Sequence, residues 1–149
     1  MSEIKQKEIP LKFFDYQKKG GNMSTRCQVK VIQKDFDSEE SVTLYHHYDG
    51  YPENMIPLFV KASQYKGCKS GRAGKVASIL CDVDPLGFEP ESGHQLHGDL
   101  SYYYKLYINI YGKDGQNWEL EVYEVNGSIA NMLIVEKRQS LAVIAKKWK

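Results

Sequence analysis

The chain has 149 residues, of which 42% are hydrophobic and 26% charged, and its formal net charge is +1. This length suits one domain with one core, and the near-neutral charge argues against sequence-independent binding of nucleic acid, which needs a strongly basic surface. No stretch is apolar over the ~18 residues that a membrane-spanning helix needs. Three cysteines without a close pair do not indicate a disulfide framework. We therefore expect a soluble, cytoplasmic protein that does not contact a membrane.

The first part of the chain predicts an arm and a hairpin. Residues 1–23 are rich in lysine and predict a flexible N-terminal arm. Apolar and polar residues alternate over 25–33 and again over 41–48, which predicts two half-buried strands. The six-residue polar connector between these strands indicates that they pair in antiparallel fashion.

Two helices are expected next. The first begins at Pro52, because proline suits the first helical position and Glu53 adds an acidic side chain to the first turn. The second runs from about Arg72 to Cys81 and ends before a turn sequence, Asp-Pro-Leu-Gly. Residues 88–98 show no periodicity and predict an irregular loop.

The last part of the chain predicts a second hairpin. Residues 99–112 alternate strongly, with Leu100, Tyr102 and Tyr104 on the core face, and the Asp-Gly pair that follows predicts a tight turn into a strand over 117–125. Residues 128–140 are compatible with either strand or helix, and a helix is expected from about Ser140.

The order ββααββ predicts an α+β fold, with a four-stranded, mainly antiparallel sheet and two helices on one of its faces. A C-terminal strand or helix element is added to this unit. We expect the core domain to span residues 24–125, between the arm at 1–23 and a C-terminal extension at 126–149 that ends in a helix.

A row of tyrosines marks the outer face of the third predicted strand. The row and its neighbours comprise Tyr103, Lys105, Tyr107, Tyr111 and, on the next strand, Tyr123. Three interpretations stay open. The side chains could form cross-strand pairs on a solvated face, a contact surface between copies of the chain in a homo-oligomer, or a platform for base stacking.

The segment 65–75 combines four basic residues with three glycines and has no acid. Backbone amides and a helix N-terminus could there approach an anion. It is not a phosphate-binding loop of nucleotide hydrolases, because Lys69 stands where that loop has glycine and Val76 stands where it has a hydroxyl residue. The segment is therefore either a solvated connector or part of a site for a small phosphorylated ligand.

Histidines occur in two further places. His94, His97 and Asp99 could together hold a divalent ion, but the spacing is common by chance, and we predict no metal and no cofactor. In "HHYDGYPEN", His47 and Asp49 could form a catalytic base with its orienting partner, although no serine or cysteine nucleophile is placed nearby. The same residues beside a helix N-terminus could instead bind an anion.

Residues 24–60 resemble a family of small uncharacterised proteins carried by phages and prophages. The pattern is Ser-Thr-Arg, a short strand, then Leu-Tyr-(Arg/His)-His-x-Asp-Gly-Tyr-Pro-Glu and a helix, and "HGDLSYYYKLYI" at 97–108 is similar to a later strand of that family. Small phage proteins of this build are often counter-defence factors. The resemblance therefore implies a protein that binds a host immune protein or sequesters a signalling nucleotide, without implying an established activity.

We therefore expect a non-enzymatic, phage-type counter-defence protein in the host bacterial cytoplasm. It would sequester a small phosphorylated or nucleotide ligand, as a homo-oligomer. The residues expected to bind the ligand are Arg26, Tyr45, His47, Asp49, Tyr51, Lys69, Arg72 and Lys75. Arginine and lysine would meet the phosphate, tyrosine would stack on the base, and Asp49 would accept from the ribose or base. Two alternatives are an inhibitor that contacts a host protein through the tyrosine face, and a hydrolase built on His47 and Asp49.

Overall fold

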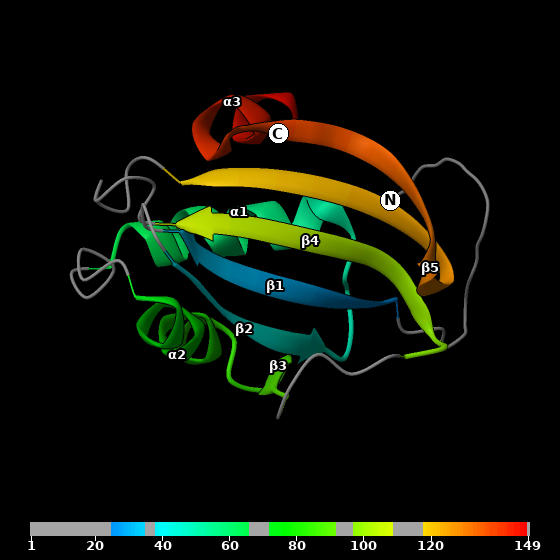
Figure 1. Ribbon diagram of the computed structural model, residues 1–149, viewed down its shortest axis with the longest axis horizontal. Helices are drawn as coiled ribbons and strands as arrows, with labels where there is room; N and C mark the ends of the chain where they lie inside the picture. Colours follow the sequence, from blue (N-terminus) through cyan, green and yellow to red (C-terminus); the bar gives the residue numbers. More distant parts are fainter. Residues whose placement is uncertain (1–24, 35–37, 66–71, 92–96, 109–117, 149) are drawn as a thin grey trace.

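The computed structural model describes residues 25–34, 38–65, 72–91, 97–108 and 118–148 (Figure 1). In chain order the elements are β1 (Arg26–Lys34), β2 (Glu39–His46), α1 (Pro52–Ser63), α2 (Ala73–Val83), β3 (Phe88–Pro90), β4 (Leu100–Ile108), β5 (Glu119–Ser140) and α3 (Leu141–Lys147). The α+β class is confirmed, and so are the two predicted helices. The predicted N-terminal arm, at residues 1–23, lies outside the described residues.

The sheet is mixed, with five strands in the order β3-β2-β1-β4-β5. Its central pair, β1 and β4, is parallel, whereas the other three neighbouring pairs are antiparallel. The predicted number of four strands was therefore wrong, and the mainly antiparallel sheet that was expected contains one parallel pair that was not foreseen. The reason is that β2 ends beside Cys27 and β4 begins beside Arg26, at the same end of the sheet, so β4 runs in the direction of β1 and pairs with its free side.

The fifth strand, β3, arises within the segment that was predicted to be an irregular loop. It has only three residues and pairs with the end of β2 at the edge of the sheet. Its last residue is Pro90, which has no backbone N–H to donate. A short edge strand that ends in proline limits pairing with other chains.

The long strand β5 doubles back on itself. Figure 1 shows that its second half returns beside the first, and Arg138 Nε meets Glu119 Oε1 at 2.6 Å across the two halves. Residues 128–140 are thus strand rather than helix, and the boundary suggested at residue 126 falls inside β5. The predicted C-terminal helix is confirmed as α3, where the side chain of Ser140 accepts a hydrogen bond from Ala142 N at 3.2 Å.

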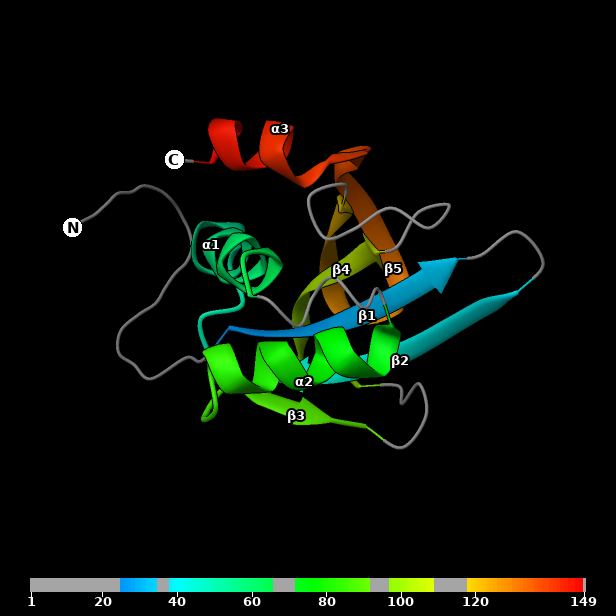
Figure 2. The same ribbon diagram turned by 90° about the vertical axis from the view of Figure 1, so that its left-hand side faces the viewer.

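The main core lies between the sheet and the helices. Figure 2 shows α1 and α2 on the same side of the sheet, while α3 packs against β5 and α1. Among the largest fully buried side chains are Trp118, Tyr104, Phe59, Leu44, Met55 and Ile56. Within the described part of the chain, no helix has both the length and the apolar character needed to span a membrane.

The opposite face of the sheet carries a second, smaller apolar cluster. Tyr45, Leu100, Tyr103 and Val125 are buried there, and residues from the second half of β5 pack against them. Leu100 was expected on the core face but lies here, because the pairing of β4 with both neighbouring strands shifts by one residue just after it. Such a bulge moves a side chain to the other face of a strand.

Buried tyrosines predict a protein that loses stability in alkaline solution. Burial raises the pKa of Tyr103 to about 12 and that of Tyr104 well above its ordinary value. An unfolded chain ionises tyrosine near pH 10, so above that pH the unfolded state binds fewer protons than the folded state. The free energy of unfolding should then fall by about 1.4 kcal/mol per pH unit for each such tyrosine.

Urea unfolding between about pH 9 and pH 12 tests this, with phenolate absorbance recorded in parallel. The midpoint should change little up to about pH 10 and fall steadily above it, and phenolate from the buried tyrosines should appear together with unfolding. A midpoint that stays constant, or full ionisation of all tyrosines in the folded protein near pH 10, would contradict the prediction.

Candidate functional site

A row of side chains crosses the sheet on the face that points away from α1 and α2. Strand register places Glu89 of β3 beside Tyr45 of β2, Tyr45 beside Gln28 of β1, and Gln28 beside Tyr103 of β4. Side chains alternate along a strand, so residues two positions away lie on the same face. Arg26, two positions before Gln28, therefore lies on the same face as the row, and so do other polar residues at the ends of β1, β2 and β3.

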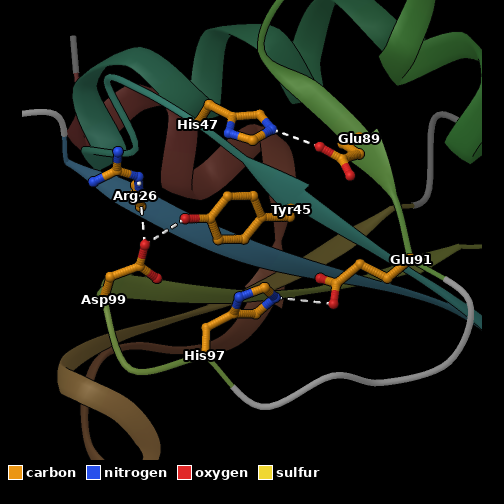
Figure 3. Close-up of polar contacts among 7 residues, drawn as sticks. All are labelled: Arg26, Tyr45, His47, Glu89, Glu91, His97 and Asp99. Carbon is orange, nitrogen blue, oxygen red and sulfur yellow. Dashed lines mark hydrogen bonds and ion pairs between the residues drawn. The ribbon is translucent and has the colours of Figure 1, made fainter.

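Tyr45 is the centre of this arrangement (Figure 3). The ring of His97 stacks on it, with centroids 4.3 Å apart, and the ring of His47 meets it edge to face at 4.8 Å. The Tyr45 hydroxyl donates to Asp99 Oδ2 at 2.7 Å, and Arg26 Nε lies 3.4 Å from the same oxygen. The site, called the Tyr45 cluster below, consists of Arg26, Tyr45, His47, Glu89, Glu91, His97 and Asp99.

Each histidine of the cluster is held by its own glutamate. His47 Nε2 lies 2.7 Å from Glu89 Oε1, and His97 Nε2 lies 3.0 Å from Glu91 Oε1. The second pair is the more rigid, because Gln28 Nε2 donates to the other oxygen of Glu91 at 3.0 Å and the Glu91 side chain is only 4% exposed. The Glu89 side chain, by contrast, is 64% exposed. The two histidines therefore have different environments.

The charge of the cluster depends on its histidines. Arg26 supplies one positive charge against three carboxylates, so the cluster is negative while both histidines are neutral and balanced when both are protonated. Burial, and then the hydrogen bond to Asp99, raises the pKa of Tyr45 well above its ordinary value. Tyr45 therefore stays protonated at neutral pH and acts as a hydrogen-bond donor.

Arg26 presents donors at the edge of the cluster. Among the described residues only its Nε makes a polar contact, and Figure 3 shows both terminal nitrogens turned away from Asp99. Its side chain is 39% exposed. Guanidinium nitrogens in this arrangement can meet an anionic group of a ligand.

The Asp-Gly turn after β2 supports the start of β1. Gly50 N donates to Thr25 O at 2.8 Å, and the Tyr104 hydroxyl donates to Gly50 O at 2.6 Å. A Cβ at position 50 would lie 2.9 Å from the Cβ of Cys27, so the close approach requires glycine. The turn thus fixes the position of the start of β1, and with it the position of Arg26.

Of the predicted ligand-binding residues, three meet in the cluster and two neighbours do not. Arg26, Tyr45 and His47 come together as described above. Asp49 adopts a φ of +49° in the turn, where its carbonyl accepts from an asparagine of α1. Tyr51 precedes α1, and its ring lies 6.0 Å from that of Tyr102, on the helix side of the sheet. The suggested pair of His47 with Asp49 does not form, because His47 bonds to Glu89 instead.

The basic segment between the helices lies elsewhere. Arg72 precedes α2 and Lys75 is in its first turn, and Ala73 N donates to Gln33 Oε1 at 2.9 Å. Gln33 is seven residues along β1 from Arg26, a distance of roughly 23 Å in an extended strand. The structure therefore does not bring Arg72 and Lys75 to the Tyr45 cluster. Lys69 lies outside the described residues.

The tyrosine face is occupied by contacts within the chain. Tyr103 is only 3% exposed. The Tyr107 hydroxyl donates to Glu121 Oε1 at 2.7 Å, and the guanidinium of Arg138 lies 3.8 Å from the Tyr107 ring centroid. Lys105 Nζ lies 5.7 Å from the ring of Tyr123. These contacts join neighbouring segments as the first interpretation expected, but at Tyr103 the face is buried rather than solvated. Tyr111 lies outside the described residues.

Four residues of the cluster were missed or assigned to another role. Glu89 and Glu91 were placed in an irregular loop, although their alternation around Pro90 could have indicated an edge strand. His97 and Asp99 were considered only as metal ligands together with His94, which lies outside the described residues. Within the described ranges, no three His, Cys, Asp or Glu side chains form a group suited to a metal ion.

Compared with protein-family models, curated proteins and solved structures, the chain has no match. The resemblance to phage proteins stays a prediction from the sequence.

Proposed function

We propose that the protein captures a small phosphorylated ligand of the nucleotide class, and that the Tyr45 cluster binds it. The supporting observation is the guanidinium of Arg26. Asp99 engages only its Nε, so both terminal nitrogens remain at the rim of an aromatic cluster. Hydrogen bonds from a guanidinium to a phosphate are charge-assisted and about twice as strong as neutral ones.

The exposed members of the cluster suit the rest of a nucleotide. Tyr45 is only 8% exposed between the two histidines, so it supports the site rather than stacking on a base as first expected. The side chain of His47 is 45% exposed and can offer its ring to a base. The carboxylates of Glu89 and Asp99, at 64% and 47% exposed, can accept from ribose hydroxyls or a base amino group.

Sequestration of a signalling nucleotide in the host cytoplasm is the biological role that we propose for this binding, on the basis of the resemblance to phage proteins. The alternative of an inhibitor that acts through the tyrosine face has less support. Tyr103 is buried, and Tyr107 already contacts Arg138 and Glu121.

Titration calorimetry with mononucleotides, 3′,5′-cyclic mononucleotides and cyclic dinucleotides tests the proposal. At least one class should bind and raise the melting temperature. The Arg26→Gln variant should bind it about 10- to 100-fold more weakly, because charged hydrogen bonds contribute about 1.5–3 kcal/mol.

The matched control is Lys75→Gln, which removes an exposed positive charge from α2, far from the cluster. Its affinity should equal that of the unaltered protein. Absence of binding by every nucleotide, or equal losses in the two variants, would refute binding at the Tyr45 cluster.

A further inference from the structure

The second half of β5 forms an edge of the sheet. Within the described ranges, β4 is the only other strand that pairs with β5, and it pairs with the first half. Figure 1 shows the returning half on the far side of the first half from β4. None of the residues 130–135 is buried, although a strand packed against a core buries every second side chain. Both faces of this stretch are therefore exposed to solvent.

Three consecutive apolar side chains occupy the exposed stretch. Leu133 is 71% exposed, Ile134 49% and Val135 38%. Successive side chains of a strand point to opposite faces, so a partner that lies on one face of the sheet cannot cover all three. A second strand that pairs with the edge places its own side chains beside them on both faces, and it also pairs their backbone groups. The partner that fits this stretch is therefore another strand.

The two edges of the sheet differ in how they resist such pairing. The edge strand β3 has only three residues and ends in Pro90, which limits pairing. The stretch 130–135 contains neither proline nor a charged residue. Charged side chains follow only from Glu136 onward, where α3 packs and Lys147 reaches the Glu136 carboxylate at 3.0 Å. The apolar stretch of β5 is thus the part of the described edges that is best suited to pairing.

The sequence of this stretch is complementary to a second copy of itself. Residues that face each other in an antiparallel pair lie on the same face of the sheet, so in a symmetric pair one residue faces its own copy on the two-fold axis. With Ile134 on the axis, Leu133 faces Val135 of the partner subunit, and Lys137 faces Asn131 of the partner subunit. Apolar side chains then meet apolar ones and no like charges face each other. A parallel pair would instead place each Lys137 beside its own copy, where the charges repel.

We propose that two copies of the chain form a dimer by antiparallel pairing of this edge, centred on Ile134. The pairing joins the two sheets into one continuous sheet. It also moves the expected homo-oligomer contact from the tyrosine face, which is occupied by contacts within the chain, to the edge of the sheet. The inference does not rest on the proposed function, because the Tyr45 cluster lies toward the opposite edge and stays open in each copy.

Sedimentation equilibrium of the full chain at micromolar concentrations tests the proposal. The unaltered protein should have twice the mass of one chain, and Ile134→Lys should have the mass of one chain. Its dissociation constant should rise by about 100-fold or more, because the axis applies the substitution twice and sets the two ammonium groups opposite each other. The matched control is Leu86→Lys, since Leu86 is 83% exposed in the turn after α2, and this variant should remain a dimer.

A charge swap tests the register. Ile134→Glu alone should also be a monomer, whereas a mixture of I134E with I134K should form a heterodimer, because opposite charges then face each other on the axis. If neither variant folds by circular dichroism, Leu133→Lys replaces them, since Leu133 is the most exposed side chain of the three.

A monomeric unaltered protein would overturn the proposal and would mean that another part of the chain, or another protein, covers this edge. Dimers that persist in I134K, or a mixture of I134K and I134E without heterodimers, would overturn the pairing centred on Ile134. Nucleotide binding should be the same in I134K as in the unaltered protein. Failure of the dimer therefore leaves the proposed function standing, and absence of nucleotide binding leaves the dimer standing.

Discussion

Replacing Gly87 by alanine is expected to lower the free energy of unfolding by about 2–4 kcal/mol. A Cβ at this position would overlap Nε2 of His46 and lie 2.5 Å from Oδ2 of Asp84. These two atoms form a hydrogen bond of 2.8 Å in which the His46 side chain is fully buried. The ring cannot retreat, because Phe88 packs against it at a centroid distance of 4.5 Å. The bond must therefore break, which leaves a buried imidazole without its partner.

The same change should disturb the Tyr45 cluster. Gly87 O accepts a hydrogen bond from His47 N at 3.0 Å, and this contact brings β3 alongside the end of β2. Glu89 faces Tyr45 only while this register is kept. We therefore expect the Gly87→Ala variant to bind nucleotides more weakly as well as to unfold at lower urea concentrations.

The matched control is Gly74→Ala. Position 74 lies in α2, and a Cβ there would have no atom within 4 Å. Alanine should stabilise this helix by about 0.5–1 kcal/mol. The prediction for Gly87 would be wrong if both variants unfolded at the same urea concentration as the unaltered protein.

Replacing Glu136 by alanine is expected to cost about 2–3 kcal/mol and to loosen α3 from β5. The Glu136 residue is 9% exposed, and its carboxylate accepts from Gln139 Nε2 at 3.2 Å, from Lys147 Nζ at 3.0 Å and from Trp148 Nε1 at 3.0 Å. The Lys147 bond contributes least, because that side chain is 52% exposed and screened by water. Most of the loss should come from the indole and amide donors left without an acceptor.

Urea unfolding and tryptophan fluorescence measure this effect. Trp118 is buried in the main core, so an early change in fluorescence should report the environment of Trp148 in the loosened helix. Glu124→Ala is the control, since Glu124 is an exposed carboxylate on the same strand, and its effect should stay within about 0.5 kcal/mol. Equal stability of the two variants would show that Glu136 does not hold α3.

Local patterns predicted the individual elements well. Alternation marked β1 and β2, and Pro52 marked the start of α1. Ser140 marked the start of α3, where its side chain accepts from Ala142 N. In each case the decisive interactions join residues close in sequence, such as a cap with its own helix or neighbours on one strand face. A pattern within one segment is enough to show them.

Pairing between distant segments was harder to predict. For the tyrosine face three interpretations stayed open, because strand alternation cannot reveal that β5 turns back and packs residues onto Tyr103. The bulge after Leu100 was equally hidden from the sequence: relative to β1, β4 has one extra residue there, and this reverses the face of the Leu100 side chain. Both outcomes depend on register, which is decided by the partner strand as much as by the strand itself.

The sequence by itself determined that a strand ends at "HHYDGYPEN", that Asp49 and Gly50 turn the chain, and that a helix starts at Pro52. Only the tertiary structure decided which side chains meet there. His47 pairs with Glu89 rather than with nearby Asp49, because the positive φ of Asp49 belongs to the turn while strand pairing brings β3 alongside β2. The candidate site thus depends on contacts across the sheet between residues about 40 positions apart in the chain, which no local pattern specifies.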